Sequence, residues 1–212
     1  QLNGVMYNEM PLRDDFTIGI GDYCNKNKNI IIANPNAPTG ICITLDDITA
    51  IAKSNPDNIV TIDEAYVDFG GDSAIKLINE LPNLIVTQTF SKSRSMAGAR
   101  LGFAVAQREL INDLSTIRYS TNPYNINSFT MNAAIAAVAE NDYFMENCRK
   151  IAETRESVKN RLEKMGFILT DSKANFLFAK HDAVSGEELY SELKRRGVLV
   201  RHFESERISQ YN

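Results

Sequence analysis

Lys92 lies among residues whose types could bind a phosphate group. It ends the run Thr-Phe-Ser-Lys at residues 89–92, and Arg100 follows it by eight residues, close to Gly98. Ser91 supplies a hydroxyl, Arg100 a two-pronged guanidinium, and Gly98 lets the backbone approach closely. A lysine amine that is desolvated at a crowded strand end can form an imine with an aldehyde. This arrangement therefore predicts a lysine that holds a phosphorylated aldehyde.

A carboxylate and a phenol lie in a second short motif. Asp63 follows the apolar run at 59–62, where an unpaired carboxylate would be costly. A protonated pyridine nitrogen would pair with this carboxylate and keep a ring electron-poor. Tyr66 lies three residues further on, and its hydroxyl could donate to a ring oxygen. The alternatives are a capping or surface carboxylate for Asp63 and a half-buried packing tyrosine for Tyr66.

A sheet must bring these residues together. Four short apolar runs are continuous rather than alternating, which is typical of α/β strands covered on both faces: residues 30–33, 59–62, 84–87 and 102–105. Ligands of open α/β sheets bind at the carboxyl ends of the strands. The Asn-Ala-Pro-Thr-Gly turn at 36–40 follows the first run, Asp63 the second and Lys92 the third. Residues far apart in sequence are therefore predicted to converge at one edge of the sheet.

Helix signals separate these runs and continue beyond them. Thr44, with Asp47 three residues later, is predicted to cap a helix that forms a β-α-β unit with the first two runs. A weaker helix is expected at 73–78. A helix rich in small residues is expected at 127–139, followed by a long charged helix at about 142–165. The charges of the long helix are interpreted as a solvated face.

The pattern changes after Gly166, which is expected to end the long helix. Ser185 is predicted to cap a further helix that ends at about residue 196. Three short runs in this part are predicted strands: residues 167–170, 175–179 and 198–201. We therefore expect an α/β fold in two parts. Residues 1–141 would form a mostly parallel sheet with flanking helices, and residues 142–212 a bridging helix with part of a smaller α+β domain.

Six segments in a fixed order extend over nearly the whole chain. They are Asn-Ala-Pro-Thr-Gly at 36–40, Asp-Glu-Ala-Tyr-Val-Asp-Phe at 63–69, Thr-Phe-Ser-Lys at 89–92, Arg-Leu-Gly at 100–102, Asn-Pro-Tyr-Asn-Ile-Asn-Ser at 122–128 and Ala-Asn-Phe-Leu-Phe at 174–178. This order resembles that of the fold-type I pyridoxal-phosphate aminotransferases. The individual residues within the segments are similar to those of the histidinol-phosphate aminotransferase family. The motifs are highly specific for the cofactor class and less specific for the substrate.

The resemblance implies a role for each candidate residue, with pyridoxal 5′-phosphate as the cofactor. Lys92 would hold the cofactor as an imine and then act as base and acid in the proton shift. Asp63 would face the pyridine nitrogen, and Tyr66 the 3′-oxygen. Ser91 and Arg100 would bind the cofactor phosphate.

Two further residues are assigned to the substrate by the same resemblance. Arg201, after the run 198–200, matches a family arginine that meets the substrate's phosphate or distal carboxylate. A surface charge on an edge strand is the alternative for Arg201. Asn175 would help to shape the substrate pocket.

One departure from the family pattern concerns the 3′-oxygen of the cofactor. The family has an asparagine immediately before Pro-Thr-Gly that reaches this oxygen, whereas this chain has Ala37 there and Asn36 one residue earlier. Either Asn36 takes over the contact through a shifted loop, or the contact is missing.

The family chain is also longer at both ends, so we expect a fragment with an incomplete site. The resemblance places a phosphate-binding helix start and a ring-stacking aromatic before this chain, and an arginine for the donor's α-carboxylate after it. It also implies a homodimer with sites at the interface.

Composition argues against several other classes of protein. The chain has 212 residues and a net charge of -4, without a basic block of the kind that favours nucleic acid. No apolar run approaches the ~20 residues that span a bilayer, and no signal peptide is visible. Three cysteines without CxxC spacing indicate reduced thiols in a cytoplasmic protein. The two histidines lack metal-ligand spacing, so no metal is expected.

The resemblance implies a transaminase that moves an amino group between L-histidinol phosphate and 2-oxoglutarate, in histidine biosynthesis. An aromatic amino-acid aminotransferase and a phospho-amino-acid decarboxylase of the same fold are the enzyme alternatives. A non-catalytic regulatory or dimerisation domain is the alternative outside the enzymes, although binding alone does not require an imine-forming lysine.

Overall fold

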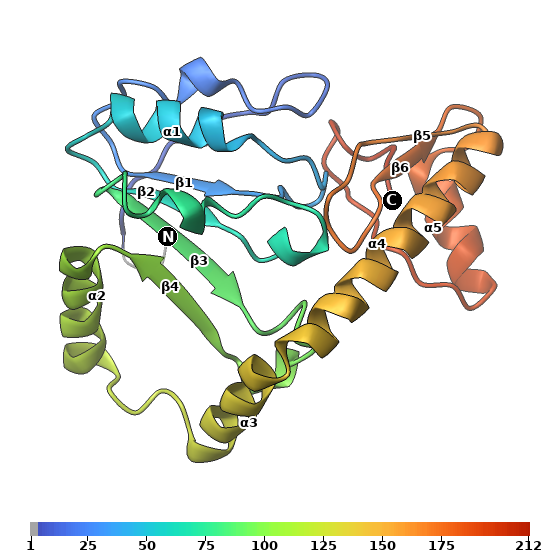
Figure 1. The fold of residues 1–212 in the computed structure, drawn as a ribbon. Helices are drawn as coiled ribbons and strands as arrows, with labels where there is room; N and C mark the ends of the chain where they lie inside the picture. The colour runs from blue at the N-terminus through green and yellow to red at the C-terminus, as the bar shows by residue number, and fades with distance from the viewer. Residues whose placement is uncertain (1–3) are drawn as a thin grey trace.

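A four-stranded sheet forms the N-terminal part of the computed structural model, which describes residues 4–212 (Figure 1). Strands β1 (Ile30–Ala33), β2 (Val60–Asp63) and β3 (Leu84–Thr89) are parallel. The fourth strand, β4 (Gly102–Ala106), is antiparallel to β3. The sheet order is β1-β2-β3-β4, which confirms the mostly parallel sheet expected from the apolar runs.

Helix α1 (Leu45–Ser54) covers one face of this sheet. The Thr44 hydroxyl accepts from the Asp47 amide, and the Asp47 carboxylate accepts from the Thr44 amide, as the capping motif predicts. Ile48 and Ile51 are fully buried against the strands. Two rows of aligned strand residues form this inner face: Ile30, Val60 and Leu84, then Ile32, Ile62 and Val86.

The opposite face of the sheet corrects one expectation. Ile31 of β1 is 77% exposed on that face, whereas Ile85 of β3, in the same row of aligned residues, is 6% exposed, so the described residues cover that face only in part. The continuous apolar runs predict strands that are buried on both faces. An apolar strand can be buried on both faces, but whether a face is buried depends on which other segments pack against it.

Three helices connect the sheet to the C-terminal part. They are α2 (Arg108–Thr121), α3 (Ser128–Ala139) and α4 (Asn141–Lys164). The α3 and α4 helices were predicted, as was the stop at Gly166, whose φ is +89°. The α2 helix was missed because Gln107 at its N-cap makes no side-chain capping bond and none of its residues is buried. The helix expected at 73–78 is only a 3₁₀ turn, η3 (Ala74–Leu77).

The C-terminal part is a small sheet packed beside α4 and α5 (Gly186–Arg195) (Figure 1). Strands β5 (Phe167–Leu169) and β6 (Ala179–His181) pair antiparallel, and Ser185 caps α5 as predicted. Two strand predictions were wrong, one in its extent and one entirely. The run 175–179 enters a strand only at Ala179, and the run 198–201 forms none.

The lost strand at 198–201 has a simple physical cause. The Val198 amide donates to the Leu193 carbonyl and so closes the end of α5, while Leu199 is largely exposed. An apolar run needs a neighbouring strand to pair with, and none of the described segments pairs with this one.

The long helix α4 starts at Asn141 and runs from α3 across to the C-terminal part (Figure 1). The domain division after residue 141 stays a prediction. No helix within residues 4–212 combines the length and the apolar character needed to cross a membrane.

Candidate active site

The strand register brings the predicted residues to one edge of the sheet. Ala33 is aligned with Asp63, Asp63 with Thr87, and Thr89 with Gly102. The segments after β1, β2 and β3 and before β4 therefore leave the sheet on the same side. These segments carry the predicted cofactor residues: Asn36, Asp63, Tyr66, Ser91, Lys92 and Arg100.

Lys92 and Tyr66 form the best-defined contact of this edge. The Lys92 Nζ lies 5.0 Å from the centroid of the Tyr66 ring, within the range of a cation–π interaction. Lys92 is exposed, and Tyr66 is half-buried with its ring packed edge-on against Phe176 at 5.1 Å. The tyrosine therefore holds a fixed ring beside a reachable amine.

Asp63 and Glu64 have opposite environments although they are neighbours. Asp63 is exposed, and its Oδ1 accepts from the Ala65 amide at 3.1 Å. Glu64 is buried and accepts from the Ser73 hydroxyl at 2.6 Å, the Ala74 amide at 2.6 Å and the Gln88 side chain at 2.9 Å. Burial raises the pKa of the Glu64 carboxyl, against the lowering effect of these donors.

Glu64 was missed from the sequence. The only available signal was the alternation of side chains along a strand, which places neighbours on opposite faces. That signal says that Asp63 and Glu64 point apart, but it does not say which of them points inward.

Ser91 and Arg100 belong to the loop between β3 and β4. The Ser91 amide donates to the Thr89 hydroxyl at 3.1 Å, and the Arg100 Nη1 donates to the Ala97 carbonyl at 3.0 Å. Arg100 is exposed and has a φ of +53°, in the left-handed region that is uncommon for residues other than glycine. A side-chain carbon at Gly98 would meet no atom within 4 Å, so the loop leaves open space beside it.

Asn36 closes the turn that follows β1. Its Oδ1 accepts from the Thr39 hydroxyl at 2.9 Å, and its carbonyl accepts from the Gly40 amide at 2.7 Å. Gly40 has a φ of +73°, and a Cβ there would lie 2.1 Å from the Ser172 hydroxyl. The turn is thus locked against the C-terminal part, and the expected contact of Asn36 with a cofactor stays a prediction.

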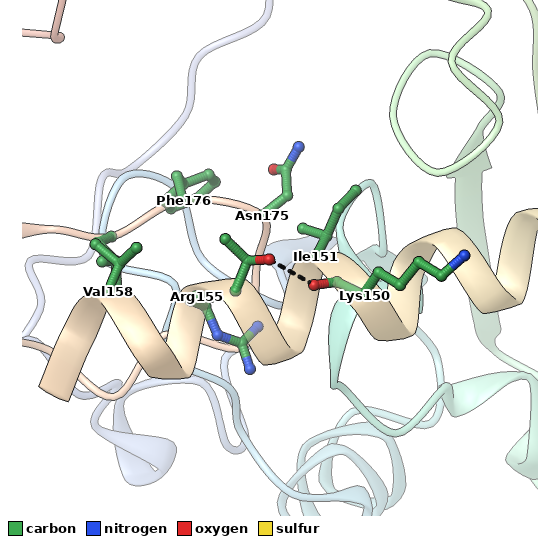
Figure 2. Close-up of a pocket in the computed structure, with 8 residues that line it drawn as sticks. Lys150, Ile151, Arg155, Val158, Asn175 and Phe176 are labelled. Atoms are coloured by element: carbon green, nitrogen blue, oxygen red, sulfur yellow. Dashed lines mark hydrogen bonds between the residues drawn. The ribbon is translucent and has the colours of Figure 1, made fainter.

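The C-terminal part contributes Asn175 to the neighbourhood of this edge. Asn175 is exposed and adjoins Phe176, which packs on Tyr66. Both line an open groove of about 380 Å³ along α4, together with Ile151, Val158 and other residues (Figure 2). The structure therefore brings Asn175 close to the predicted site through its neighbour.

Arg201 is not brought to this edge by any contact among the described residues. Its guanidinium lies 5.8 Å from the centroid of the Phe203 ring, and Phe203 packs on Phe178. The strand that was expected to present Arg201 is absent. Its role toward a substrate stays a prediction.

The fold and the residues at this edge define the class: the chain has the fold of the fold-type I aminotransferases. The family model "Aminotransferase class I and II" matches residues 1–211, and the chain belongs to that family. The resemblance read from the six motifs is confirmed.

Individual relatives of this chain, by sequence and by structure, include histidinol-phosphate aminotransferases. The chain is 50% identical over 204 residues to histidinol-phosphate aminotransferase of Brachyspira hyodysenteriae, a match that covers 96% of this chain and 58% of that protein. The crystal structure of histidinol-phosphate aminotransferase from Clostridium acetobutylicum matches with a TM-score of 0.84 and 27% identity, over 94% of this chain and 63% of that one. The enzyme of Sinorhizobium meliloti, solved in complex with pyridoxal-5'-phosphate, matches with a TM-score of 0.75 and 26% identity, over 86% of this chain and 51% of that one. The chain thus spans little more than half the length of these relatives.

Proposed function

We propose that the protein is a pyridoxal-phosphate-dependent transaminase of histidine biosynthesis. It moves the amino group of L-histidinol phosphate to 2-oxoglutarate. The observation that carries this proposal is the placement of an exposed lysine amine beside Tyr66 at the carboxyl edge of the sheet, in a chain half identical to a histidinol-phosphate aminotransferase.

The residues at this edge fit pyridoxal 5′-phosphate by their chemistry. The Lys92 amine suits an aldehyde, the exposed Asp63 carboxylate suits a pyridinium nitrogen, and the exposed Arg100 guanidinium suits a phosphate. The open space at Gly98 allows a group to approach the loop that carries Arg100. When bound, the cofactor supplies an electron sink for the carbon that loses a proton.

Each side chain then has a defined task. Lys92 binds the aldehyde of the cofactor. Its Nζ then takes the proton that one carbon atom loses and gives it to a second carbon atom. Asp63 keeps a proton on the ring nitrogen, and the Tyr66 hydroxyl donates to the 3′-oxygen. Ser91 and Arg100 hold the phosphate through charge-assisted bonds.

Three further residues are assigned contacts with the cofactor or the substrate. Asn36 contributes its side-chain amide to the 3′-oxygen, because its Oδ1 is engaged by Thr39. Asn175 shapes the substrate pocket beside Phe176. Arg201 meets the phosphate of the substrate or the distal carboxylate of 2-oxoglutarate; its side chain is exposed and forms no ion pair within residues 4–212.

Turnover by the intact protein tests the reaction. L-histidinol phosphate and 2-oxoglutarate are supplied with pyridoxal phosphate, and glutamate formation is followed. Activity that is absent in Lys92→Ala supports the proposal. Turnover of aromatic amino acids alone would indicate an aromatic amino-acid aminotransferase instead. Loss of carbon dioxide from a phospho-amino acid would indicate a decarboxylase of the same fold. A wild-type protein that gains no visible absorbance with pyridoxal phosphate would favour a non-catalytic domain.

The proposal includes a homodimer as the assembly and the cytoplasm as the location. The α3 helix supports an interface because most of its residues are apolar, yet Phe129, Ile135 and Val138 are each at least 60% exposed. Three free cysteines suit a reducing compartment. Sedimentation equilibrium of the intact protein tests the assembly, and a monomer at micromolar concentration would contradict it.

A further inference from the structure

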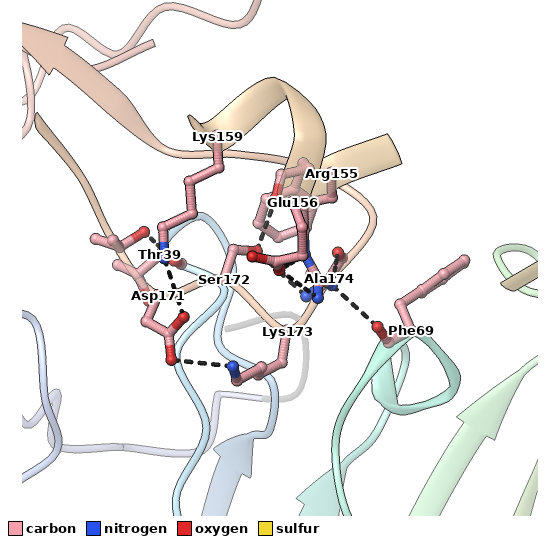
Figure 3. A network of polar contacts seen from close by, with 11 residues as sticks. Thr39, Phe69, Arg155, Glu156, Lys159, Asp171, Ser172, Lys173 and Ala174 are labelled. Atoms are coloured by element: carbon pink, nitrogen blue, oxygen red, sulfur yellow. Dashed lines mark hydrogen bonds and ion pairs between the residues drawn. The ribbon is translucent and has the colours of Figure 1, made fainter. Parts of the chain in front are cut away.

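Arg155 is a buried charge in α4 that lies outside the predicted site. Its residue is 9% exposed, and its guanidinium binds two main-chain carbonyls at once (Figure 3). The Nη1 donates to the Phe69 carbonyl at 2.9 Å and to the Ala174 carbonyl at 2.8 Å. The Nε and Nη2 donate to the Glu156 carboxylate, which is half exposed. A single side chain therefore joins α4 to two separate loops.

The first of these loops carries Tyr66. The 3₁₀ turn η2 (Val67–Phe69) starts immediately after Tyr66, and the Phe69 amide donates to the Tyr66 carbonyl at 3.2 Å. Gly70, the next residue, has a φ of +146°, and a Cβ there would lie 3.5 Å from the Arg155 guanidinium. The backbone that ends this turn is thus shaped around the arginine.

The second loop carries Asn175 and Phe176. Ala174, whose carbonyl Arg155 binds, directly precedes them and is fully buried. Phe176 packs edge-on against the Tyr66 ring, and the same ring faces the Lys92 amine at 5.0 Å. Both loops held by Arg155 therefore meet again at Tyr66.

The chemistry of arginine explains why this residue can hold both loops. A guanidinium has several donors in a rigid planar fork, whereas the lysine ammonium is a compact point charge on a flexible stem. Two carbonyl dipoles and one carboxylate compensate the buried charge. A lysine at this position would keep the charge but lose the fork.

We propose that Arg155 is a positioning residue for the candidate site: it sets the Tyr66 hydroxyl and the Asn175 side chain relative to the Lys92 amine by holding the Phe69 and Ala174 carbonyls together. Its effect on the cofactor rests on the proposed function, whereas its effect on the two loops does not.

The first experiment needs no cofactor. Amide hydrogen exchange is measured on the intact apo-protein, in the wild type, in Arg155→Lys and in a control, Arg149→Lys. Arg149 lies on the same helix but is exposed and pairs only with Glu146 and Glu153 there. In Arg155→Lys we expect exchange of the Phe69 and Gly70 amides to accelerate about tenfold, the effect of losing about 1.4 kcal/mol of local stability. Wild-type exchange in Arg155→Lys would overturn the proposal.

A milder variant keeps the proposal testable if Arg155→Lys does not fold. Glu156→Gln retains the arginine and removes the charge that orients its Nε and Nη2. We expect a smaller acceleration, about twofold, at the same amides. No change at these amides in a folded Glu156→Gln, together with unfolding of Arg155→Lys, would assign Arg155 a general stabilising role and overturn the positioning role.

The second experiment reads the position of the Tyr66 hydroxyl in the loaded protein. The pH midpoint of the visible absorbance of bound pyridoxal phosphate is compared in the wild type, Arg155→Lys, Tyr66→Phe and the double variant. A hydroxyl that donates to the 3′-oxygen changes this midpoint, so we expect Arg155→Lys to shift it in the same direction as Tyr66→Phe. In the Tyr66→Phe background the arginine substitution should add nothing. Equal shifts in both backgrounds would contradict the proposal. A wild type without a visible band would refute the proposed function, and the exchange experiment would still decide the role of Arg155.

Discussion

At the scale of single residues, Tyr66 connects the two parts of the candidate site. Its ring faces the Lys92 amine on one side and packs against Phe176 on another. The residues on the sheet side come from the strand ends, and Phe176 comes from the C-terminal part. A change at Tyr66 is therefore expected to disturb both cofactor and substrate positions.

The Lys92 amine is the first residue to test. Lys92→Ala removes the amine that we propose carries the proton, and we expect kcat to fall by about 10³-fold. Lys76→Ala is the control, because Lys76 is exposed and, within residues 4–212, pairs only with Asp72. Steady-state kinetics with L-histidinol phosphate measures both. A kcat within threefold of the wild type in Lys92→Ala would remove Lys92 from the mechanism.

The buried Glu64 carboxyl predicts a pH dependence of stability. Burial raises its pKa above the ordinary 4.5, so the folded state holds the proton more tightly than the unfolded state does. The stability from this group is complete below pH 4.5 and is lost as the pH rises through the raised folded value. Urea unfolding of Glu64→Gln between pH 4 and 8 should give a flatter decline of the unfolding free energy than the wild type. Parallel curves would show that Glu64 titrates normally.

At the scale of elements, local capping chemistry could be predicted and strand pairing could not. The predicted caps Thr44 and Ser185 each accept a hydrogen bond through the side-chain hydroxyl from an amide in the first turn of the helix. These contacts lie within three residues, so the sequence contains both partners. The run 198–201 is as apolar as a strand, but its pairing depends on a distant segment that local pattern does not reveal.

The α1 cap gives the prediction at this scale. Thr44→Ala removes the hydroxyl that accepts from the Asp47 amide, and we expect a loss of about 1 kcal/mol in unfolding free energy. Thr49→Ala on the same helix is the matched control, because the Thr49 hydroxyl only donates back to the Leu45 carbonyl. Denaturant unfolding measures both variants. Equal losses of unfolding free energy in the two variants would show that the capping hydrogen bond of Thr44 does not itself stabilise the helix.

At the scale of the whole molecule, hydrogen bonds join the two parts of the chain beside the candidate site. The Thr170 hydroxyl donates to the Thr39 carbonyl at 2.6 Å (Figure 3). The Lys173 amide donates to the Gly40 carbonyl at 2.8 Å. With Arg155, these bonds tie the C-terminal part to the turn after β1 and to the turn after β2. Asp63 and Lys92 were predicted from the strand-end rule and Arg100 from the phosphate-binding residue types near Lys92, whereas the proposed role of Arg155 requires contacts across the chain that have no local signature.

The partly covered face of the sheet has a consequence for handling the 212-residue chain. Ile31, on the strand at one edge of the sheet, presents apolar surface there, a feature that favours aggregation between molecules. We expect this chain by itself to scatter light increasingly above micromolar concentration and to brighten a hydrophobic dye. Ile31→Lys should reduce both signals, whereas Ile135→Lys on α3 tests whether that helix contributes instead. If Ile31→Lys leaves both signals unchanged, this face is not the cause. A loss of both signals in Ile135→Lys would instead place the cause on α3, and a solubilising substitution for biochemical work belongs there.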